Sequence, residues 1–555
     1  MKSEKDIFLV GKLTFLILLL LTARSVSFPS RTFGESNRAR LLTPADLGAP
    51  GGRCGTEAKR REHASDIYRS VSLSDCDLSK SANLESYRPD AVGVIPVWVH
   101  VIRDDSGEWG EVSDEMIRGQ IERLNEDYRA RPGSLGENGV DSMVQFQLAG
   151  VTRYNNTRYF QDQDEYDYKS KMQKDPKKYL NIYTNTASYY FGYAYFPAVE
   201  AGTVLDGVVI YYEAFAYNTP YMAPYDLGRT TTHEVGHYLG LFHPFEKGYF
   251  DWGPPCPSGD KPFCYENGDL ICDTNPQEWE TYGCPLNAES CGSPDPFRNY
   301  MGYSDDDCMM EFTAEQVLRM HCSLKAYRPD LVMLGRKLKV EKTGRGEGEI
   351  ITSPEGISCG QKCSEYFADG SQMTLTAIPG PGYSFDGWEP NASVAVCQGN
   401  EACVIALDRD CQATAAFNSD QDGDGVGDEI ENKGPNNGDG NRDAILDSLQ
   451  KNVATLKNVT GKYITLISTR GTKLSDVRFT NYPQGCTQPL PEKFPFGLLG
   501  FTVTGFKPGE ATIVHALFYN QTETVNGYFN YGPTVENQED HFQDFSRAPY
   551  NSTTL

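Results

Sequence analysis

One short stretch of the chain, His233–His243, contains three histidines, a glutamate and a glycine at fixed spacing (HEVGHYLGLFH). Residues four apart on a helix share one face, so the side chains of His233 and His237 can hold the same ion. Gly240 permits a backbone conformation that most residues avoid, and the chain can therefore turn so that His243 supplies a third nitrogen. Three protein ligands leave a fourth position open to water, which is typical of a catalytic zinc site.

Glu234 lies between the two helical histidines and is placed to take a proton from that water. A carboxylate held within reach of a water molecule is a common general base. The alternative is a helix with three core histidines and no metal, which requires five positions to agree by chance. The stretch therefore predicts a hydrolase that uses one zinc ion.

A second segment, Asn299–Tyr303, follows downstream (NYMGY). It is similar to the methionine turn of the metzincins, which runs beneath the zinc ion. Met301 is then expected to be a buried floor that packs under the histidines without binding the metal. Tyr303 resembles the tyrosine that in several metzincins swings near the metal and stabilises the oxyanion. The alternative is that Met301 and Tyr303 are ordinary core and surface residues.

With both motifs, the part of the chain from Ile95 to Cys322 resembles the pappalysin family of metzincins, which includes ulilysin-like secreted enzymes of bacteria and fungi. The resemblance implies a zinc endopeptidase with an α+β, zincin-like catalytic domain. A cleft would separate its upper β-sheet subdomain from a smaller lower one. The other segments that carry the resemblance are Ile95–Ile102, Gln120–Tyr128, Leu180–Tyr183, Asp206–Ile210, Gly228–Thr232 and Phe312–Gln316.

The elements that must position these motifs follow from hydrophobic periodicity. Ser113 can cap a helix whose apolar stripe has helical spacing. The turn into the zinc helix is expected over Asp226–Thr232, and His100 is expected to be a hydrogen-bonded strand histidine. The predicted strands are Val94–Ile102, Val144–Val151 and Asp206–Tyr212, and the helical stripe is Ile117, Ile121, Leu124 and Tyr128.

A short segment before Pro197 resembles the edge strand that binds the substrate backbone in this family. An exposed edge pairs with an extended peptide by strand addition. The expected substrate-binding residues are Phe191, Gly192, Tyr193 and Ala194.

Composition indicates an exported protein of several domains. The chain has 555 residues, a net charge of -25 and 15 cysteines. So many cysteines favour an oxidising compartment with disulfides. The acidic balance argues against nucleic acid as a partner and favours calcium binding or simply solubility.

The N-terminus fits export. Lysines at positions 2, 5 and 12 precede the apolar run Leu13–Leu21, which is short for a membrane span. We therefore predict a cleaved signal peptide at residues 1–27, with an uncleaved signal anchor as the alternative. No later segment is apolar and long enough to cross a membrane. The mature protein is expected to be secreted, with at most a loose association with the cell envelope.

A polar, Arg-rich segment at residues 28–90 precedes the protease domain, which is predicted at residues 91–328. Its Cys54-Gly55 pair is similar to a cysteine switch, in which a thiolate occupies the open zinc position and excludes water. Setting Cys54 aside leaves an even number of cysteines, although a Cys54–Cys76 disulfide is the alternative. Lys59-Arg60-Arg61 is either a maturation cut or a solvated basic patch.

Residues 244–298 are rich in Cys, Gly, Pro and Asp, so a loop-dominated lower subdomain held by disulfides is expected. The family pattern implies Cys284 with Cys308, and Cys291 with either Cys256 or Cys264. Cys272 departs from that pattern and leaves its partner open. By the same resemblance, calcium near the active site is expected at Asp269, Asp273 and Thr274.

Three smaller modules are predicted after residue 328. Residues 337–417 are short, alternating and rich in turns, and resemble a bacterial surface β-repeat of the internalin-B type. Residues 451–555 are also β-rich and resemble a domain of bacterial surface proteins. We expect all-β modules that serve as spacers or contact a cell surface or matrix.

Between these modules, residues 418–450 place oxygen-bearing side chains at alternate positions with glycine turns. This is the geometry of calcium loops, and the segment resembles thrombospondin type 3 repeats. An acidic disordered linker is the alternative. The expected calcium ligands are Asp420, Asp422, Asp424, Asp428, Glu431, Asp439, Asn441 and Asp443.

The sequence thus predicts a secreted zinc endopeptidase that is kept latent by Cys54. Zinc would activate water and polarise the scissile carbonyl, while Glu234 takes the proton of the water and returns it to the leaving amine. The alternative function is a surface adhesin or matrix-binding protein in which the protease domain is secondary.

Overall fold

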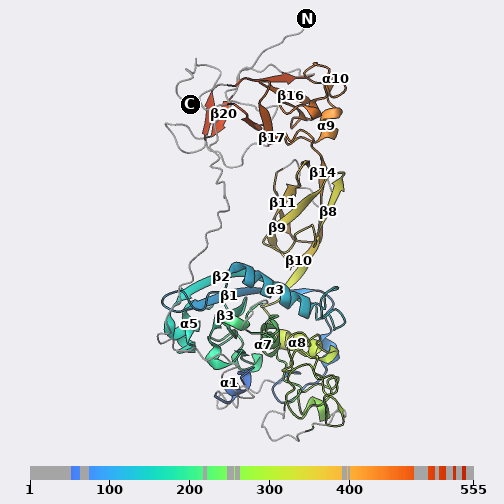
Figure 1. Cartoon of the computed structure of the whole chain (residues 1–555). Helices are drawn as coiled ribbons and strands as arrows, with labels where there is room; N and C mark the ends of the chain where they lie inside the picture. Colours follow the sequence, from blue (N-terminus) through green and yellow to red (C-terminus); the bar gives the residue numbers. More distant parts are fainter. Residues whose placement is uncertain are drawn as a thin grey trace, which may run out of the picture. The chain divides into compact units, whose positions relative to one another are not determined.

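The computed structural model describes residues 52–62, 74–216, 222–246, 256, 263–389, 397, 401–480, 498–506, 512–519, 529–532 and 541–544 (Figure 1). The chain forms two compact units. Residues 33–336 and 366–371 belong to the N-terminal unit, and residues 337–365 and 372–555 to the C-terminal unit. The predicted signal peptide lies outside the described residues.

A twisted sheet forms the upper part of the N-terminal unit. Its strand order is β2-β1-β3-β5-β4, where only β4 runs antiparallel to its neighbour. Residues 333–334, at the start of β8 (Met333–Gly344), pair with the beginning of β1. The bounds are β1 Gly93–Arg103, β2 Val144–Asn155, β3 Leu180–Asn185, β4 Gly192–Ala194 and β5 Val208–Tyr211.

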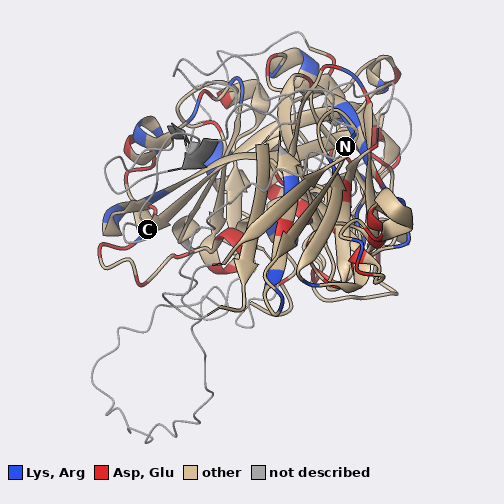
Figure 2. Ribbon diagram, turned by 90° about the horizontal axis from the view of Figure 1, so that it is seen from above, with Lys and Arg blue, Asp and Glu red and all other residues tan. Residues whose placement is uncertain are grey.

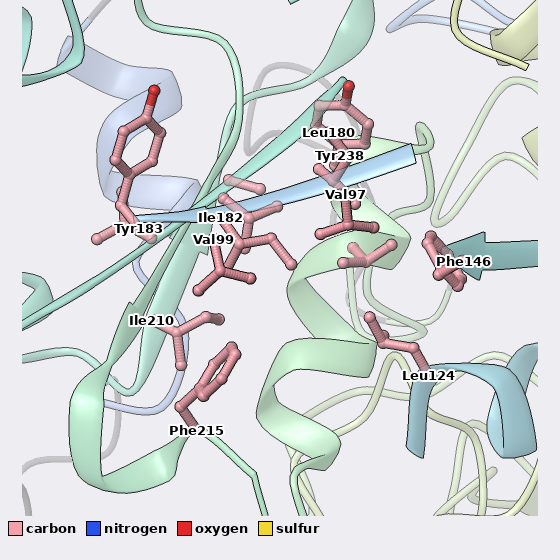
Figure 3. Packing of buried hydrophobic residues seen from close by; sticks show 14 of the residues in the cluster. Val97, Val99, Leu124, Phe146, Leu180, Ile182, Tyr183, Ile210, Phe215 and Tyr238 are labelled. Atoms are coloured by element: carbon pink, nitrogen blue, oxygen red, sulfur yellow. The ribbon is translucent and has the colours of Figure 1, made fainter. Parts of the chain in front are cut away.

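The central strands are buried on both faces because their Val and Ile side chains pack against helices (Figure 3). Each such side chain stabilises the fold by about 1.5–3 kcal/mol relative to exposure. The strand predicted at 94–102 is confirmed. The strand at 144–151 extends to Asn155, and its Gln145 is buried rather than exposed because it bonds with Arg129 and the Tyr366 carbonyl. The third strand begins two residues later than predicted, after Gly207 at φ +118°.

Among the described residues this unit has three longer helices, and the first two pack on this sheet. Ser113 caps α3, Asp114–Tyr128, as predicted, and its stripe of Ile117, Ile121, Leu124 and Tyr128 is buried. Helix α7, Arg229–Tyr238, lies below β1 and β3 in Figure 1. A capping box of Thr313 and Gln316 begins α8, Ala314–Tyr327. The shorter helices are α1 Thr56–Glu62, η2 Leu84–Tyr87, α4 Thr157–Phe160, α5 Glu165–Met172, η3 Ala187–Tyr189, α6 Pro197–Glu200, η4 Tyr212–Ala214 and η5 Phe263–Tyr265.

Disulfides hold the loop-rich lower part, in which the described residues form the short strands β6 Glu289–Ser290 and β7 Ser293–Pro294. The pairs Cys284–Cys308 and Cys256–Cys291 agree with the family pattern, and Cys272 pairs with Cys264.

Residues 74–90, hereafter the strap, are tied to α8 by a Cys76–Cys322 disulfide. Arg319 of α8 also donates hydrogen bonds to the Asp77 carbonyl and to Ser81. The alternative Cys54–Cys76 pairing is therefore wrong, and Cys54 is a free, buried thiol. Cys411 is also free among the described residues, and Cys486 lies outside them, so the parity argument is not tested.

The C-terminal unit is mainly β-structure, so the predicted fold class, an α+β domain followed by β-rich modules, is confirmed. Its first part contains two small sheets, β12-β14-β8 and β13-β11-β9, and disulfides Cys359–Cys363 and Cys397–Cys403. A further strand, β10 Ser364–Ala368, pairs with β8. The strands of the two sheets are β8 Met333–Gly344, β9 Gly348–Ser353, β11 Ser371–Pro379, β12 Tyr383–Trp388, β13 Cys403–Leu407 and β14 Cys411–Ser419.

The second part of this unit contains three further sheets, β15-β16-β19, β17-β18 and β20-β21. Its helices are short. The elements are α9 Asp428–Asn432, α10 Pro435–Gly438, η6 Asp447–Leu449, β15 Val453–Lys457, β16 Tyr463–Ser468, β17 Lys473–Thr480, β18 Leu498–Thr504, β19 Val514–Phe518, β20 Phe529–Gly532 and β21 His541–Asp544.

Acidic and basic side chains are interspersed along the chain, and acidic ones are the more numerous, 76 against 51 (Figure 2). Among the described residues, no helix combines the length and the apolar character needed to span a bilayer.

Candidate active site

Helix α7 carries the first two histidines, and a distant residue fixes where it begins. The carboxylate of Asp306 accepts hydrogen bonds from the amides of Leu227 and Arg229, at 3.0 and 3.2 Å. A carboxylate at a helix N-terminus satisfies free amides and favours the helix dipole. The helix therefore begins at Arg229, and the turn predicted over residues 226–232 is wrong beyond Gly228.

The third histidine is brought back by the turn at Gly240. This residue has φ +93°, and a Cβ there would collide with the Ser323 side chain of α8. Both the conformation and the lack of space require glycine. His243 thereby returns to the face of α7 that carries His233 and His237.

The three imidazoles converge through one nitrogen each. The Nε2 atoms are 3.0–3.2 Å apart. Nδ1 of His233 faces the Tyr300 carbonyl at 2.8 Å, and Nδ1 of His237 faces the Leu241 carbonyl at 2.7 Å. A carbonyl accepts only, so these two rings carry their protons on Nδ1 and present Nε2 lone pairs to one another.

Burial keeps the imidazoles neutral. It lowers the pKa of His237 to about 4, and burial with the neighbouring histidines lowers the pKa of His233 and His243 well below the usual range. Lone pairs about 3 Å apart repel unless a cation lies between them. Nitrogen ligands at about 2.0–2.1 Å from a tetrahedral zinc ion are spaced by roughly 3.3 Å. The trio therefore fits zinc, and Sγ of Cys54 belongs to the same cluster, whose ligand atoms all lie within 4.8 Å of one another.

The Glu234 carboxylate lies beside this cluster and is fully buried. Its Oε2 accepts hydrogen bonds from Thr56 Oγ1 at 3.1 Å and Cys54 Sγ at 3.5 Å. Its Oε1 has no hydrogen-bond partner among the described residues. Burial raises the pKa of this carboxyl to about 8, against the lowering effect of the bonds from Cys54 and Thr56. A carboxyl with a pKa near neutrality can both accept and return a proton.

Met301 and Tyr303 line the same centre. Met301 is buried with its sulfur so close to Gly236 that a Cβ there would collide with it. The methionine thus supports α7 from below. The Tyr303 ring is buried, with its centroid 5.7 Å from that of His233 and 5.1 Å from that of His243.

The edge strand β4 is already paired with a segment of residues 52–56. The Gly55 amide donates to the Gly192 carbonyl at 2.8 Å, and the Phe191 amide to the Gly52 carbonyl at 2.9 Å. The Ala194 amide donates to Thr56 Oγ1. The bridge between Cys54 and Gly192 is parallel. The predicted substrate edge and the predicted latency cysteine therefore meet.

Arg53 and Asp306 belong to this site and were missed in the sequence. The guanidinium of Arg53 donates to the carbonyls of Tyr303 and Ser304, at 3.0 and 2.5 Å, and lies 3.3 Å from Asp306 Oδ1. It also lies 4.3 Å above the centre of the Tyr225 ring. Nothing in the sequence distinguishes Asp306 from Asp305 and Asp307 on either side of it.

The predicted calcium ligands of the N-terminal unit are only partly together. Thr274 donates to Asp269 at 2.6 Å, and burial raises the pKa of Asp269 to about 8. The Asp273 carboxylate instead accepts a hydrogen bond from the Glu315 amide in the first turn of α8.

In the C-terminal unit, Asp420, Asp422 and Asp424 form one buried acidic cluster. Glu431 is fully buried, accepts a hydrogen bond from the Thr455 amide, and interacts electrostatically with Asp424. Asp428 is turned toward Ser419 and the Gln421 amide. The second predicted run forms its own turn, in which Asp439 and Asn441 accept hydrogen bonds from the Asp443 amide.

Comparisons with known proteins match two parts of the chain to known families. The family model described as pregnancy-associated plasma protein-A, a peptidase family, matches residues 163–325. The divergent InlB B-repeat domain matches residues 342–421, which confirms the resemblance predicted there.

Two similar proteins are fungal. An extracellular metalloprotease of Colletotrichum graminicola is 33% identical over 282 residues, covering 50% of this chain and 91% of that protein. Extracellular metalloprotease 1 of Coccidioides posadasii is 34% identical over 242 residues, covering 42% of this chain and 78% of that protein. Among solved structures, Tannerella forsythia mature mirolysin in complex with a cleaved peptide is 29% identical, covers 44% of this chain and 99% of that chain, and has a TM-score of 0.34.

Proposed function

Since the chain belongs to the pappalysin family of zinc metalloendopeptidases, we propose that it is secreted in a latent form whose active site is built from His233, His237, His243 and Glu234. The observation that carries this proposal is the convergence of three imidazole lone pairs beside a buried carboxyl with an unpaired oxygen. His233, His237 and His243 would hold the ion. Zinc would supply Lewis-acid chemistry, activating water and polarising the scissile carbonyl.

The side chains around the trio then have distinct tasks. Glu234 takes the proton of the attacking water and delivers it to the leaving amine. Tyr303 is close enough to the imidazoles to donate to the developing oxyanion. Strand β4 aligns the extended substrate through backbone hydrogen bonds.

Latency rests on residues 52–62, hereafter the inhibitory segment. Its Cys54 reaches the metal position, its Thr56 occupies Glu234 Oε2, and its backbone occupies β4. One segment thus blocks the metal, the base and the substrate edge together. The strap, held by Cys76–Cys322, would remain with the mature enzyme after any cut upstream of it.

Arg53 indicates which substrates the mature enzyme accepts. It fills a recess whose floor is Asp306, and Oδ2 of Asp306 stays fixed by two backbone amides whether or not Arg53 is present. Release of the inhibitory segment removes Arg53, the ion-pair partner of the buried Asp306 Oδ1, and leaves Arg229 as the cation that still acts on this carboxylate. Loss of a partner from a buried ion pair is costly. A planar guanidinium matches that carboxylate and the two carbonyls above it. We infer a preference for arginine beside the scissile bond.

The test is cleavage of a mixed peptide library by the matured protein, with and without a zinc chelator. We expect chelator-sensitive cuts that cluster next to arginine. Asp306→Asn should lower kcat/KM for arginine peptides by about tenfold or more, because a charge-assisted hydrogen bond is replaced by a neutral one. Asp305→Asn, one residue away, is the matched control. Cleavage without a preference for arginine would contradict the proposed role of Asp306 in substrate recognition. Absence of cleavage by a zinc-loaded sample would contradict the proposed peptidase function.

Calcium is proposed for the buried acidic cluster of the C-terminal unit. Asp422, Asp424 and Glu431 each keep one buried carboxylate oxygen without a hydrogen-bond partner among the described residues. Burial and mutual repulsion raise the pKa of Asp422 to about 7 and of Glu431 to about 11. Unpaired carboxylate oxygens are the ligands that calcium prefers.

The stability of this unit should depend on pH and calcium together. The raised pKa values mean that the folded state binds more protons than the unfolded state, so without calcium its stability falls as pH rises from about 4 through 7. Calcium replaces those protons. We therefore expect millimolar calcium to raise the Tm of this unit more at pH 7.5 than at pH 5, in calorimetry of the full chain against a chelator. Asp424→Asn should remove the calcium effect, whereas exposed Asp408→Asn should keep it. An equal rise in Tm at both pH values would contradict the proposed calcium site.

A further inference from the structure

A second basic side chain of the inhibitory segment enters an acidic recess on the other side of Cys54 from Arg53. Lys59 Nζ lies 2.9 Å from Glu165 Oε2 and 4.6 Å from the centre of the Tyr193 ring. The two charged side chains are only 14% and 11% exposed. The pair is therefore well shielded from water, unlike an ordinary surface ion pair.

The recess is built by the N-terminal unit and not by the inhibitory segment. Tyr195 donates its hydroxyl to Glu165 Oε2 at 2.9 Å. Buried Lys169 lies 2.8 Å from Oε1 of the same carboxylate. Asp162, behind Tyr193, accepts hydrogen bonds from the Tyr193 and Tyr168 hydroxyls. Although burial opposes it, Lys169 and Lys59 lower the pKa of Glu165 to about 2, so this group is ionised.

Each oxygen of the Glu165 carboxylate has an ammonium partner only while Lys59 is present. Lys169 lies 2.8 Å from Oε1 and Lys59 lies 2.9 Å from Oε2, whereas burial and Glu165 raise the pKa of the neighbouring Asp162. Lys169 is anchored below the recess, where it also donates to the Leu205 carbonyl at 2.7 Å. Removal of the inhibitory segment takes the Lys59 ammonium group away from Glu165 Oε2 and leaves Tyr195 as its hydrogen-bond donor among the described residues. A basic side chain of the substrate in the place of Lys59 would again neutralise the shielded carboxylate of Glu165.

The recess adjoins the substrate strand. Tyr193, which forms its aromatic wall, is the middle residue of β4, and Ala194 next to it binds Thr56. The inhibitory segment runs parallel to β4. A substrate paired with β4 in the antiparallel sense runs the opposite way. Its residue near Glu165 then precedes the scissile bond, and its residue near Asp306 follows it.

We propose that Glu165, Tyr193 and Tyr195 form a second specificity subsite, which takes a lysine or arginine side chain of the substrate on the amino side of the scissile bond. This inference rests on the proposed peptidase function and extends it. Substrates that carry one basic residue on each side of the cut are preferred. The inhibitory segment fills both recesses with its own Arg53 and Lys59.

The simpler reading is that the recess only anchors the inhibitory segment. Peptides cleaved by the matured wild-type protein separate the two readings without any variant. Each peptide keeps arginine after the scissile bond and carries either lysine or norleucine two, three or four residues before it. Norleucine keeps the length of the chain and removes the charge.

We expect lysine to raise kcat/KM by about tenfold over norleucine at one of these positions, because it donates to an ionised carboxylate. Glu165→Gln should abolish this preference, and Asp167→Asn, an exposed ion-pair residue on the same helix, should keep it. Affinity of the same peptides for the matured Glu234→Ala protein is measured in parallel. Equal rates and equal affinities for lysine and norleucine at every position overturn the subsite. In that case cleavage of the arginine peptides still supports the peptidase. Tighter binding of lysine peptides without any cleavage supports the subsite and contradicts the peptidase.

Discussion

Replacing Glu234 by alanine is expected to lower kcat/KM of the matured enzyme by about 10³-fold, within the 10²–10⁴-fold range of general acid–base catalysis. The carboxyl is buried beside the imidazole trio, and one of its oxygens has no hydrogen-bond partner among the described residues, so alanine removes the base assigned to this site. Peptide hydrolysis at saturating zinc measures the effect.

The zinc content should not change, because Glu234 is not one of the converging nitrogen donors. Metal analysis of the purified variant therefore separates a lost base from a lost metal. Glu234→Gln keeps the shape of the side chain and should be equally inactive. Activity within tenfold of wild type in either variant would contradict the assigned base. Any surface binding by the C-terminal unit should survive both substitutions, which also tests the adhesin alternative.

Replacing Cys54 by alanine in the full-length protein is expected to raise its peptidase activity before maturation. The loss of one metal–sulfur contact should shift the equilibrium from the inhibited toward the open form by about tenfold or more. A tenfold shift corresponds to about 1.4 kcal/mol. Burial and Glu234 raise the pKa of the Cys54 thiol well above its usual value. The thiolate therefore depends on a bound cation for its stability, and the cation in turn gains a strong ligand.

Latency should not vanish completely in this variant, because Arg53 and Lys59 still occupy their recesses. Cys411→Ala is the matched control, since Cys411 is also a free cysteine of the described structure and lies in the other unit. It should leave latency unchanged. If the Cys54→Ala protein is as inactive before maturation as the wild type, Cys54 does not contribute to latency. Latency would then depend on the backbone pairing along β4 and on Arg53 and Lys59 alone.

The local parts of this site could be predicted from the sequence. The spacing of His233, Glu234 and His237 follows from the period of one helix, and Gly240 marks the turn that returns His243. Ser113 and the apolar stripe behind it defined α3 in the same way. These features depend on residues a few positions apart, for which the backbone geometry is nearly fixed.

Pairings across long separations depended on the tertiary structure. Arg53 and Asp306 are 253 positions apart, and Cys76 and Cys322 are 246 apart. Three consecutive aspartates, 305 to 307, look alike in the sequence, and only the path of the chain places the middle one at the start of α7. The start of that helix was misjudged for the same reason.

The sequence by itself therefore determined the chemistry of this protein, because metal-ligand spacing is a property of one helix and one turn. The tertiary structure decided what blocks the site and which side chains surround it. Those choices depend on buried charges such as Asp306 and Glu165, whose partners are selected by three-dimensional proximity in a shielded interior and not by sequence distance.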